Sequence, residues 1–133
     1  MPPHKIIVLY GHGNLGKTRT LRMVIDILNG EPISYTPSDA QTICHYNDLI
    51  IAFATKGDNA AKLRANVSYF KSHPCDIAIT AARSRGGTHD VIKAYTQKTG
   101  AEAVWIYKRA EAGDKNAVNL KWAERVVEKI STR

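Results

Sequence analysis

Cysteine is scarce in this 133-residue chain, and long apolar runs are absent. Its two cysteines, Cys44 and Cys75, lie far apart in apolar surroundings. They are therefore expected to be buried free thiols in a reducing cytosol, and neither a disulfide nor a metal site is expected. No apolar stretch approaches the ~20 residues that a membrane span needs, and the N-terminus has no signal-peptide pattern. These absences predict a cytoplasmic protein with no membrane partner.

Internal repeats, low-complexity tracts and linkers are also missing. The length suits one domain, large enough for a sheet covered by helices but not for a second catalytic module. The composition, with 44% hydrophobic and 23% charged residues, is ordinary for a soluble globular protein. The net charge of +7 favours an anionic partner. A nucleotide, a nucleic acid or an acidic protein surface would all satisfy it.

Short apolar runs alternate along the chain with segments of helical periodicity. Clear strands are expected at 5–10, 49–54, 76–80 and 103–107, and weak ones at 33–35 and 42–45. Helices are expected at 17–29, around 63–70, from an N-cap at Thr88, and from about 116 to 130.

This alternation implies parallel strands joined by crossover helices. The expected fold class is α/β, a three-layer α/β/α sandwich with a mainly parallel sheet. Ligands of such sheets bind at the carboxyl ends of the strands. The segments of interest are therefore those that follow Tyr10, Ala54, Thr80 and Tyr107.

A glycine-rich segment follows the first strand directly, and it reads Gly11-His12-Gly13-Asn14-Leu15-Gly16-Lys17-Thr18. It fits the pattern G-x-x-x-x-G-K-[ST] without a departure, between an expected strand and an expected helix. Glycines allow left-handed backbone angles that turn N–H groups toward phosphate oxygens. The helix that follows adds its dipole and its unpaired N–H donors.

The segment resembles the Walker A motif of the P-loop nucleoside triphosphatases. The resemblance implies a single P-loop nucleotide-binding domain over residues 1–133, with ATP or another nucleoside triphosphate and Mg²⁺ as cofactors. In that reading Lys17 reaches the outer phosphates and Thr18 takes a magnesium position. The implied nucleotide-binding residues are Gly11, His12, Gly13, Asn14, Leu15, Gly16, Lys17, Thr18 and Arg19.

P-loop enzymes usually place an aspartate at the end of a second apolar strand to hold the magnesium shell. This chain departs from that pattern, because Asp48 and Asp76 stand at the beginnings of their strands. The best substitute is Asp58, which could bind magnesium or act as a base. An equally good interpretation makes Asp58 the N-cap of the following helix.

The stretch Thr55-Lys56-Gly57-Asp58 also looks like the [N/T]-K-x-D motif with which GTPases read guanine. No D-x-x-G lies between the glycine-rich loop and this segment, and the strand comes early in the chain. GTP therefore stays a minority alternative to ATP.

Basic and glycine residues follow the third strand, in the stretch from Thr80 to Thr88. Arginines at this edge of a sheet neutralise the charge on a transferred phosphoryl group. Arg83 and Arg85 are therefore candidate catalytic residues beside Lys17 and Asp58. The alternative is a flexible basic turn that faces solvent.

Three functions compete at this point. The leading hypothesis is a P-loop NTPase that hydrolyses ATP with Mg²⁺. The second is a small nucleotide or metabolite kinase with Asp58 as its base. The third is a nucleotide-regulated module that binds nucleic acid or an acidic protein. The broad apolar side of the last helix also leaves a homo-oligomer open, and Tyr107 and Lys108 are candidates for contact with a nucleotide base.

Overall fold

The computed structural model describes residues 3–12, 15–35, 40–57, 59–84 and 87–131. Within these ranges the strands are β1 (Lys5–Gly11), β2 (Gln41–Tyr46), β3 (Leu49–Ala54), β4 (Ile77–Arg83) and β5 (Glu102–Tyr107). The helices are α1 (Lys17–Asn29), α2 (Ala60–Ser72), α3 (Thr88–Thr99) and α4 (Lys115–Ser131). None of these helices combines the length and apolarity that a membrane crossing requires.

The strands form one sheet in the order β2-β3-β4-β1-β5. Neighbours from β3 to β5 run parallel, as the alternation predicts. Strand β2 runs antiparallel to β3, so the sheet is mixed. The expectation of a mainly parallel sheet thus needs correction at its β2 edge.

The antiparallel edge results from the tight turn between β2 and β3. Asn47 and Asp48 both have positive φ, 49° and 64°. Two such residues in succession match the two-residue hairpin turn whose twist suits antiparallel strands. Asparagine and aspartate tolerate this conformation better than most residues. The pair Asn47-Asp48 is therefore the sequence feature that could have predicted the hairpin.

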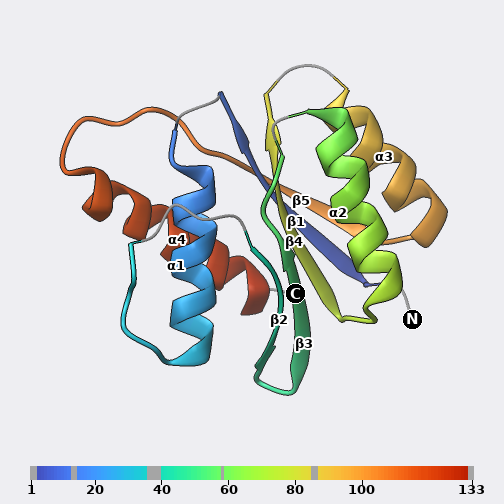
Figure 1. Ribbon diagram of the computed structural model, residues 1–133, viewed down its shortest axis with the longest axis horizontal. Coiled ribbons are helices and arrows are strands. Elements are labelled where there is room, and N and C mark those ends of the chain that lie inside the picture. Colours follow the sequence, from blue (N-terminus) through green and yellow to red (C-terminus); the bar gives the residue numbers. More distant parts are fainter. Residues whose placement is uncertain (1–2, 13–14, 36–39, 58, 85–86, 132–133) are drawn as a thin grey trace.

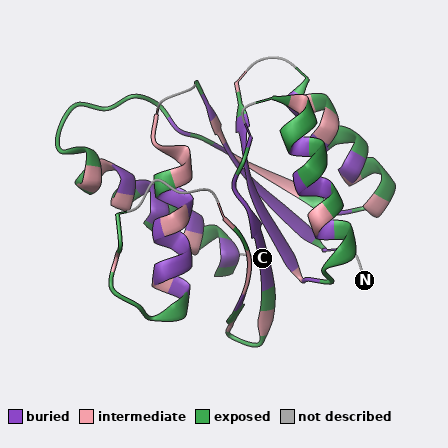
Figure 2. Ribbon diagram, in the orientation of Figure 1, coloured by how far each residue is buried: buried purple, intermediate pink, exposed green. Residues whose placement is uncertain are grey.

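Helices cover both faces of the sheet, α1 and α4 on one and α2 and α3 on the other (Figure 1). Alternate residues of β1 serve the two faces: Ile7 and Leu9 pack toward α1 and α4, whereas Ile6 and Val8 pack toward α2 and α3. The central strands are buried along most of their length (Figure 2). Burial on both faces explains why they read as continuous apolar runs.

Some element boundaries differ from the sequence expectation. Residues 33–35 form no strand. Strand β4 continues to Arg83, three residues beyond the expected end at Thr80. The N-cap of α3 is Gly87, and Thr88 is the first helical residue. The Thr88 hydroxyl donates to the carbonyl oxygen of Arg83 at 3.2 Å.

Both cysteines are buried and free, as expected. Burial raises the pKa of the Cys75 thiol to about 11, against an ordinary 9.0, and raises that of Cys44 as well. Both side chains therefore stay neutral near pH 7 and act as apolar core residues.

Candidate functional site

The glycine-rich loop joins the carboxyl end of β1 to the start of α1. Gly11 is the last residue of β1, and Gly16, with φ 78°, is the N-cap of α1. As a glycine, this N-cap has no side chain with which to cap the helix, and the first turn holds no acidic residue. The positive end of α1 is therefore not balanced by an acidic side chain of its own first turn, which favours an anion nearby. Gly13 and Asn14 lie outside the described residues.

Lys17 folds back over the loop. Its Nζ donates to the carbonyl oxygens of Gly11 at 2.7 Å and His12 at 2.8 Å. The ammonium group thus lies at the loop, and its contact with the outer phosphates of a nucleotide stays a prediction. Thr18 follows it in the first turn, partly buried, and Arg19 is exposed.

The loop is supported from behind by the segment after β5 and by α4. A Cβ at Gly11 would lie 2.5 Å from the carbonyl oxygen of Lys108, and one at Gly16 would lie 2.9 Å from the side-chain amide of Asn119. Both glycines are therefore required by close packing, and Gly16 also by its positive φ. Asn119 was not predicted as part of the site, although a polar residue on the apolar side of a helix could have indicated a specific contact.

Lys108 is nearly fully buried, with 2% of its surface exposed. Its Nζ donates to the carbonyl oxygen of Leu15, and its backbone N–H donates to Tyr10 at 2.8 Å. Burial lowers the pKa of this amine, and the negative charge of Glu111 acts in the opposite direction. The Lys108 side chain is thus directed to the loop backbone, which makes it a positioning residue for the glycine-rich loop.

The connection between β3 and α2 holds the candidate acid. Asp58 itself lies outside the described residues. The N-cap of α2 is Asn59, whose side chain accepts a hydrogen bond from Lys62 N–H at 2.9 Å. The interpretation of Asp58 as this cap is therefore wrong, and its metal or base role stays a prediction.

The residues before Asp58 are held firmly. Thr55 is buried, and its hydroxyl oxygen accepts from Ala40 N–H at 2.8 Å. A Cβ at Gly57 would overlap the Ala81 carbonyl oxygen, so glycine is required there. Lys56 is exposed between them.

A buried polar pair, missed from the sequence, ties this segment to β4 and α2. The side-chain nitrogen of Asn66 lies among three acceptors, the carbonyl oxygens of Ala54 and Lys56 and the hydroxyl of Thr80. The Thr80 hydroxyl donates in turn to Ala54 at 2.8 Å. These contacts fix the direction in which the chain leaves β3 toward Asp58.

The structure brings Arg83 to the glycine-rich loop. Arg83 ends β4 in register with Gly11, and its side chain is exposed. The next residue, Ser84, donates its N–H to Gly11 at 3.2 Å, and its hydroxyl lies 3.4 Å from Nδ1 of His12. The second arginine of this segment, Arg85, lies outside the described residues.

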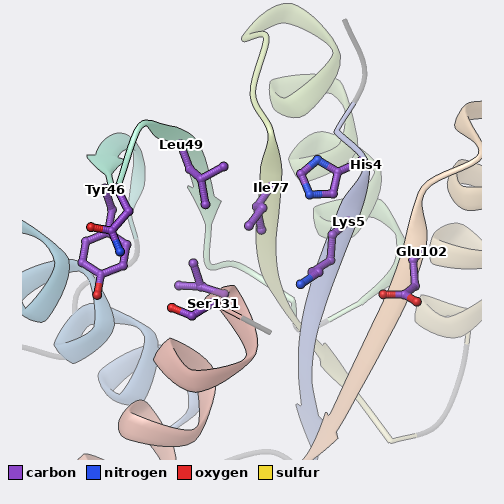
Figure 3. A pocket seen from close by; sticks show the side chains of 9 residues that line it. His4, Lys5, Tyr46, Leu49, Ile77, Glu102 and Ser131 are labelled. Carbon is purple, nitrogen blue, oxygen red and sulfur yellow. The ribbon is translucent and has the colours of Figure 1, made fainter. Parts of the chain in front are cut away.

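Two hollows lie away from this loop. One of about 610 Å³ is at the opposite edge of the sheet, between the starts of β1 and β5, the β2–β3 turn and the end of α4 (Figure 3). Its buried lysine, Lys5, donates to the Lys129 carbonyl oxygen at 3.0 Å. The other, of about 450 Å³, lies between α2 and α3. Because ligands of α/β sheets bind at the carboxyl ends of the strands, the glycine-rich loop is the better candidate site.

The described part of the chain contains no ready-made cluster of metal ligands. No group of three or more histidine, cysteine, aspartate or glutamate side chains gathers there. The magnesium role of Thr18 stays a prediction.

Comparison of the chain with protein-family models, with curated proteins and with solved structures gives no match. The function is therefore inferred from the geometry of the site.

Proposed function

We propose that this chain is an ATP-binding P-loop NTPase that hydrolyses ATP with Mg²⁺, and that its fold is the three-layer sandwich of that superfamily. The observation that carries the proposal is the loop itself. Between Gly11 and Thr18, Lys17 lies over the loop carbonyls, and α1 begins at a left-handed glycine with no acidic residue in its first turn. A loop built only as a turn needs neither feature.

The close contacts around the loop support the same conclusion. Gly11 and Gly16 have no room for a side chain, because Lys108 and Asn119 press against them. Backbone N–H groups can then approach phosphate oxygens directly. On nucleotide binding, Lys17 would exchange its carbonyl acceptors for the outer phosphates.

Hydrolysis would depend on positioning and charge, with no covalent intermediate. Thr18 would hold the magnesium ion, which screens the phosphate charge when it is bound. Arg83, exposed beside Gly11, would neutralise charge on the transferred group, together with Arg85. Asp58 would orient the attacking water or assist the metal.

A nucleotide panel tests the proposal. Thermal shifts are measured with ATP, ADP and GTP plus Mg²⁺ on the wild type and on Lys17→Ala. Lys98→Ala is the control, because it removes the same charge from an exposed site in the last turn of α3. We expect a shift with ATP that Lys17→Ala abolishes and Lys98→Ala retains; no shift with any nucleotide would refute nucleotide binding.

Phosphate release is then measured without and with added acceptors. Release without an acceptor supports hydrolysis. Release only when a nucleotide or metabolite acceptor is added would replace the NTPase by a kinase.

A further inference from the structure

An aromatic cluster lies on the sheet beside the glycine-rich loop and has no part in the phosphate site. It consists of Tyr10 at the end of β1, Trp105 and Tyr107 on β5, and His89 in the first turn of α3. Tyr10 and Tyr107 are register partners, which brings their rings together at the carboxyl edge of the sheet.

The rings are ordered by contacts with one another. His89 stacks on Trp105 with ring centres 4.6 Å apart, and Tyr10 meets both rings edge-on at 5.4 and 5.5 Å. Nε2 of His89 lies 3.2 Å from the Arg83 carbonyl oxygen, which fixes the imidazole. Tyr107 lies at the outer end, 5.1 Å from Tyr10, with 40% of its surface exposed.

Exposed basic residues lie close in the chain to members of this cluster. Arg109 lies two residues after Tyr107 and is exposed. Lys93 follows His89 by one helical turn and is also exposed. Two exposed acids also lie near in the chain: Asp90 next to His89, and Glu111 two residues after Arg109, where it forms an ion pair with Lys121 at 3.1 Å.

We propose that Tyr107, supported by Tyr10 and by the His89–Trp105 stack, binds an unpaired base of single-stranded nucleic acid, while Arg109 contacts its phosphates. Proteins that bind single strands combine such aromatic stacking surfaces with positive charge along the backbone path. The net charge of +7 agrees with a polyanionic partner.

The aromatic cluster and α1, the helix that follows the glycine-rich loop, lie on opposite faces of the sheet. Tyr10 and Trp105 pack with the α2 and α3 side of the sheet, whereas α1 covers the other side. The proposal therefore does not depend on nucleotide hydrolysis, and the surface is a second site at the same edge.

Binding is measured by fluorescence anisotropy with labelled oligo(dT) and oligo(U) of about twelve nucleotides, a length within the range of single-strand sites. The two oligonucleotides distinguish DNA from RNA as the source of the strand. We expect Tyr107→Ala to weaken binding about tenfold and Tyr107→Phe to retain it, because the ring makes the contact. Tyr35→Ala is the matched control, since Tyr35 is also an exposed tyrosine, at 43%.

The salt dependence separates the roles of ring and charge. Arg109→Ala should reduce the slope of log K against log salt by about 0.7, the value for one phosphate contact on a single strand. Tyr107→Ala should leave that slope unchanged.

Several outcomes would overturn the proposal. Equal affinity for a duplex of the same length would mean that charge alone binds. Unchanged binding by Tyr107→Ala, or no binding of either oligonucleotide, would exclude the stacking role. An acidic peptide that binds this surface in place of the oligonucleotide would make it a protein interface. Loss of ATP affinity alone in Tyr107→Ala would assign the ring to the nucleotide base.

The result is distinguishable from a failure of the NTPase proposal. Lys17→Ala should bind the oligonucleotide as the wild type does when no nucleotide is present. If Lys17→Ala keeps its response to ATP while Tyr107→Ala loses the oligonucleotide, the nucleotide site is wrong and the strand site stands.

Discussion

At the scale of single residues, Lys108 lies outside the glycine-rich motif yet contacts it twice, and it also pairs with the residue just before it. Its side-chain amine donates to the Leu15 carbonyl oxygen, and its backbone N–H donates to the Tyr10 carbonyl oxygen. Its own carbonyl oxygen leaves no space for a Cβ at Gly11. Burial of an amine costs free energy, and its lowered pKa reports that cost. A residue that is buried at such a cost is expected to contribute to the site.

We predict that Lys108→Met weakens ATP binding about tenfold, because the Leu15 carbonyl loses its donor and the loop loses a fixed contact. The free energy of unfolding should change little, since removal of a desolvated ammonium offsets the lost hydrogen bond. Calorimetric titration with ATP and urea unfolding measure the two effects. Lys115→Met, an exposed lysine at the start of α4, is the control; equal ATP affinity in both variants would remove Lys108 from the site.

At the scale of elements, the connection from β3 to α2 separates two roles that share one short segment. Asn59 caps α2, so Asp58 is not needed for that role. The two adjacent residues can therefore be tested against one another.

We predict that Asn59→Ala lowers the free energy of unfolding by about 1 kcal/mol, the usual cost of a lost N-cap, and leaves Mg²⁺-dependent phosphate release nearly unchanged. Asp58→Ala should do the reverse, with near-native stability and a large loss of phosphate release. Urea unfolding and a phosphate assay on both variants decide the matter. Asn59→Asp should retain stability, because aspartate caps equally well; a destabilised but fully active Asp58→Ala would exclude the catalytic role.

Helices and central strands were the most predictable elements. The strand at 49–54 and the helix at 17–29 were correctly predicted because their burial imposes continuous or periodic apolar residues. Strand β2 was only weakly predicted, because Cys44 is its one fully buried side chain. The extension of β4 to Arg83 was not predictable from the run of apolar residues, since it depends on pairing with Gly11.

Of the site, the sequence predicted the loop because its chemistry is local in the chain. Gly16 and Lys17 act within a few residues of one another. Asn119 was missed, and Lys108 was considered only for contact with a nucleotide base, because both residues reach the loop from far along the chain. No local pattern encodes such contacts, and only the packing of β5 and α4 against β1 creates them.

At the scale of the whole molecule, strand order decides which segments share the ligand edge. Strand β4 lies between β1 and β3. Arg83 is therefore the direct neighbour of the loop, and the segment that holds Asp58 is one strand farther away. The sheet thus places positive charge, and not acid, immediately beside the glycine-rich loop, which suits a site that binds anions strongly.

This charge distribution predicts how the molecule responds to different anions. Sodium chloride should raise the melting temperature slightly by screening the repulsion of a net charge of +7. Tripolyphosphate at the same ionic strength should raise it further, because it also occupies the loop. At ten times its dissociation constant the added stability is about 1.4 kcal/mol, which corresponds to roughly 5 °C for a domain of this size. Differential scanning fluorimetry measures both shifts.

Lys17→Ala and Lys98→Ala lower the net charge equally, so screening affects them equally. Only Lys17→Ala should lose the extra effect of tripolyphosphate, because Lys17 lies over the Gly11 and His12 carbonyls whereas Lys98 is exposed near the end of α3. If both variants lose it together, the anion acts through the overall charge and the loop has no special affinity. If both keep it, the phosphate-binding groups lie elsewhere on this positive molecule.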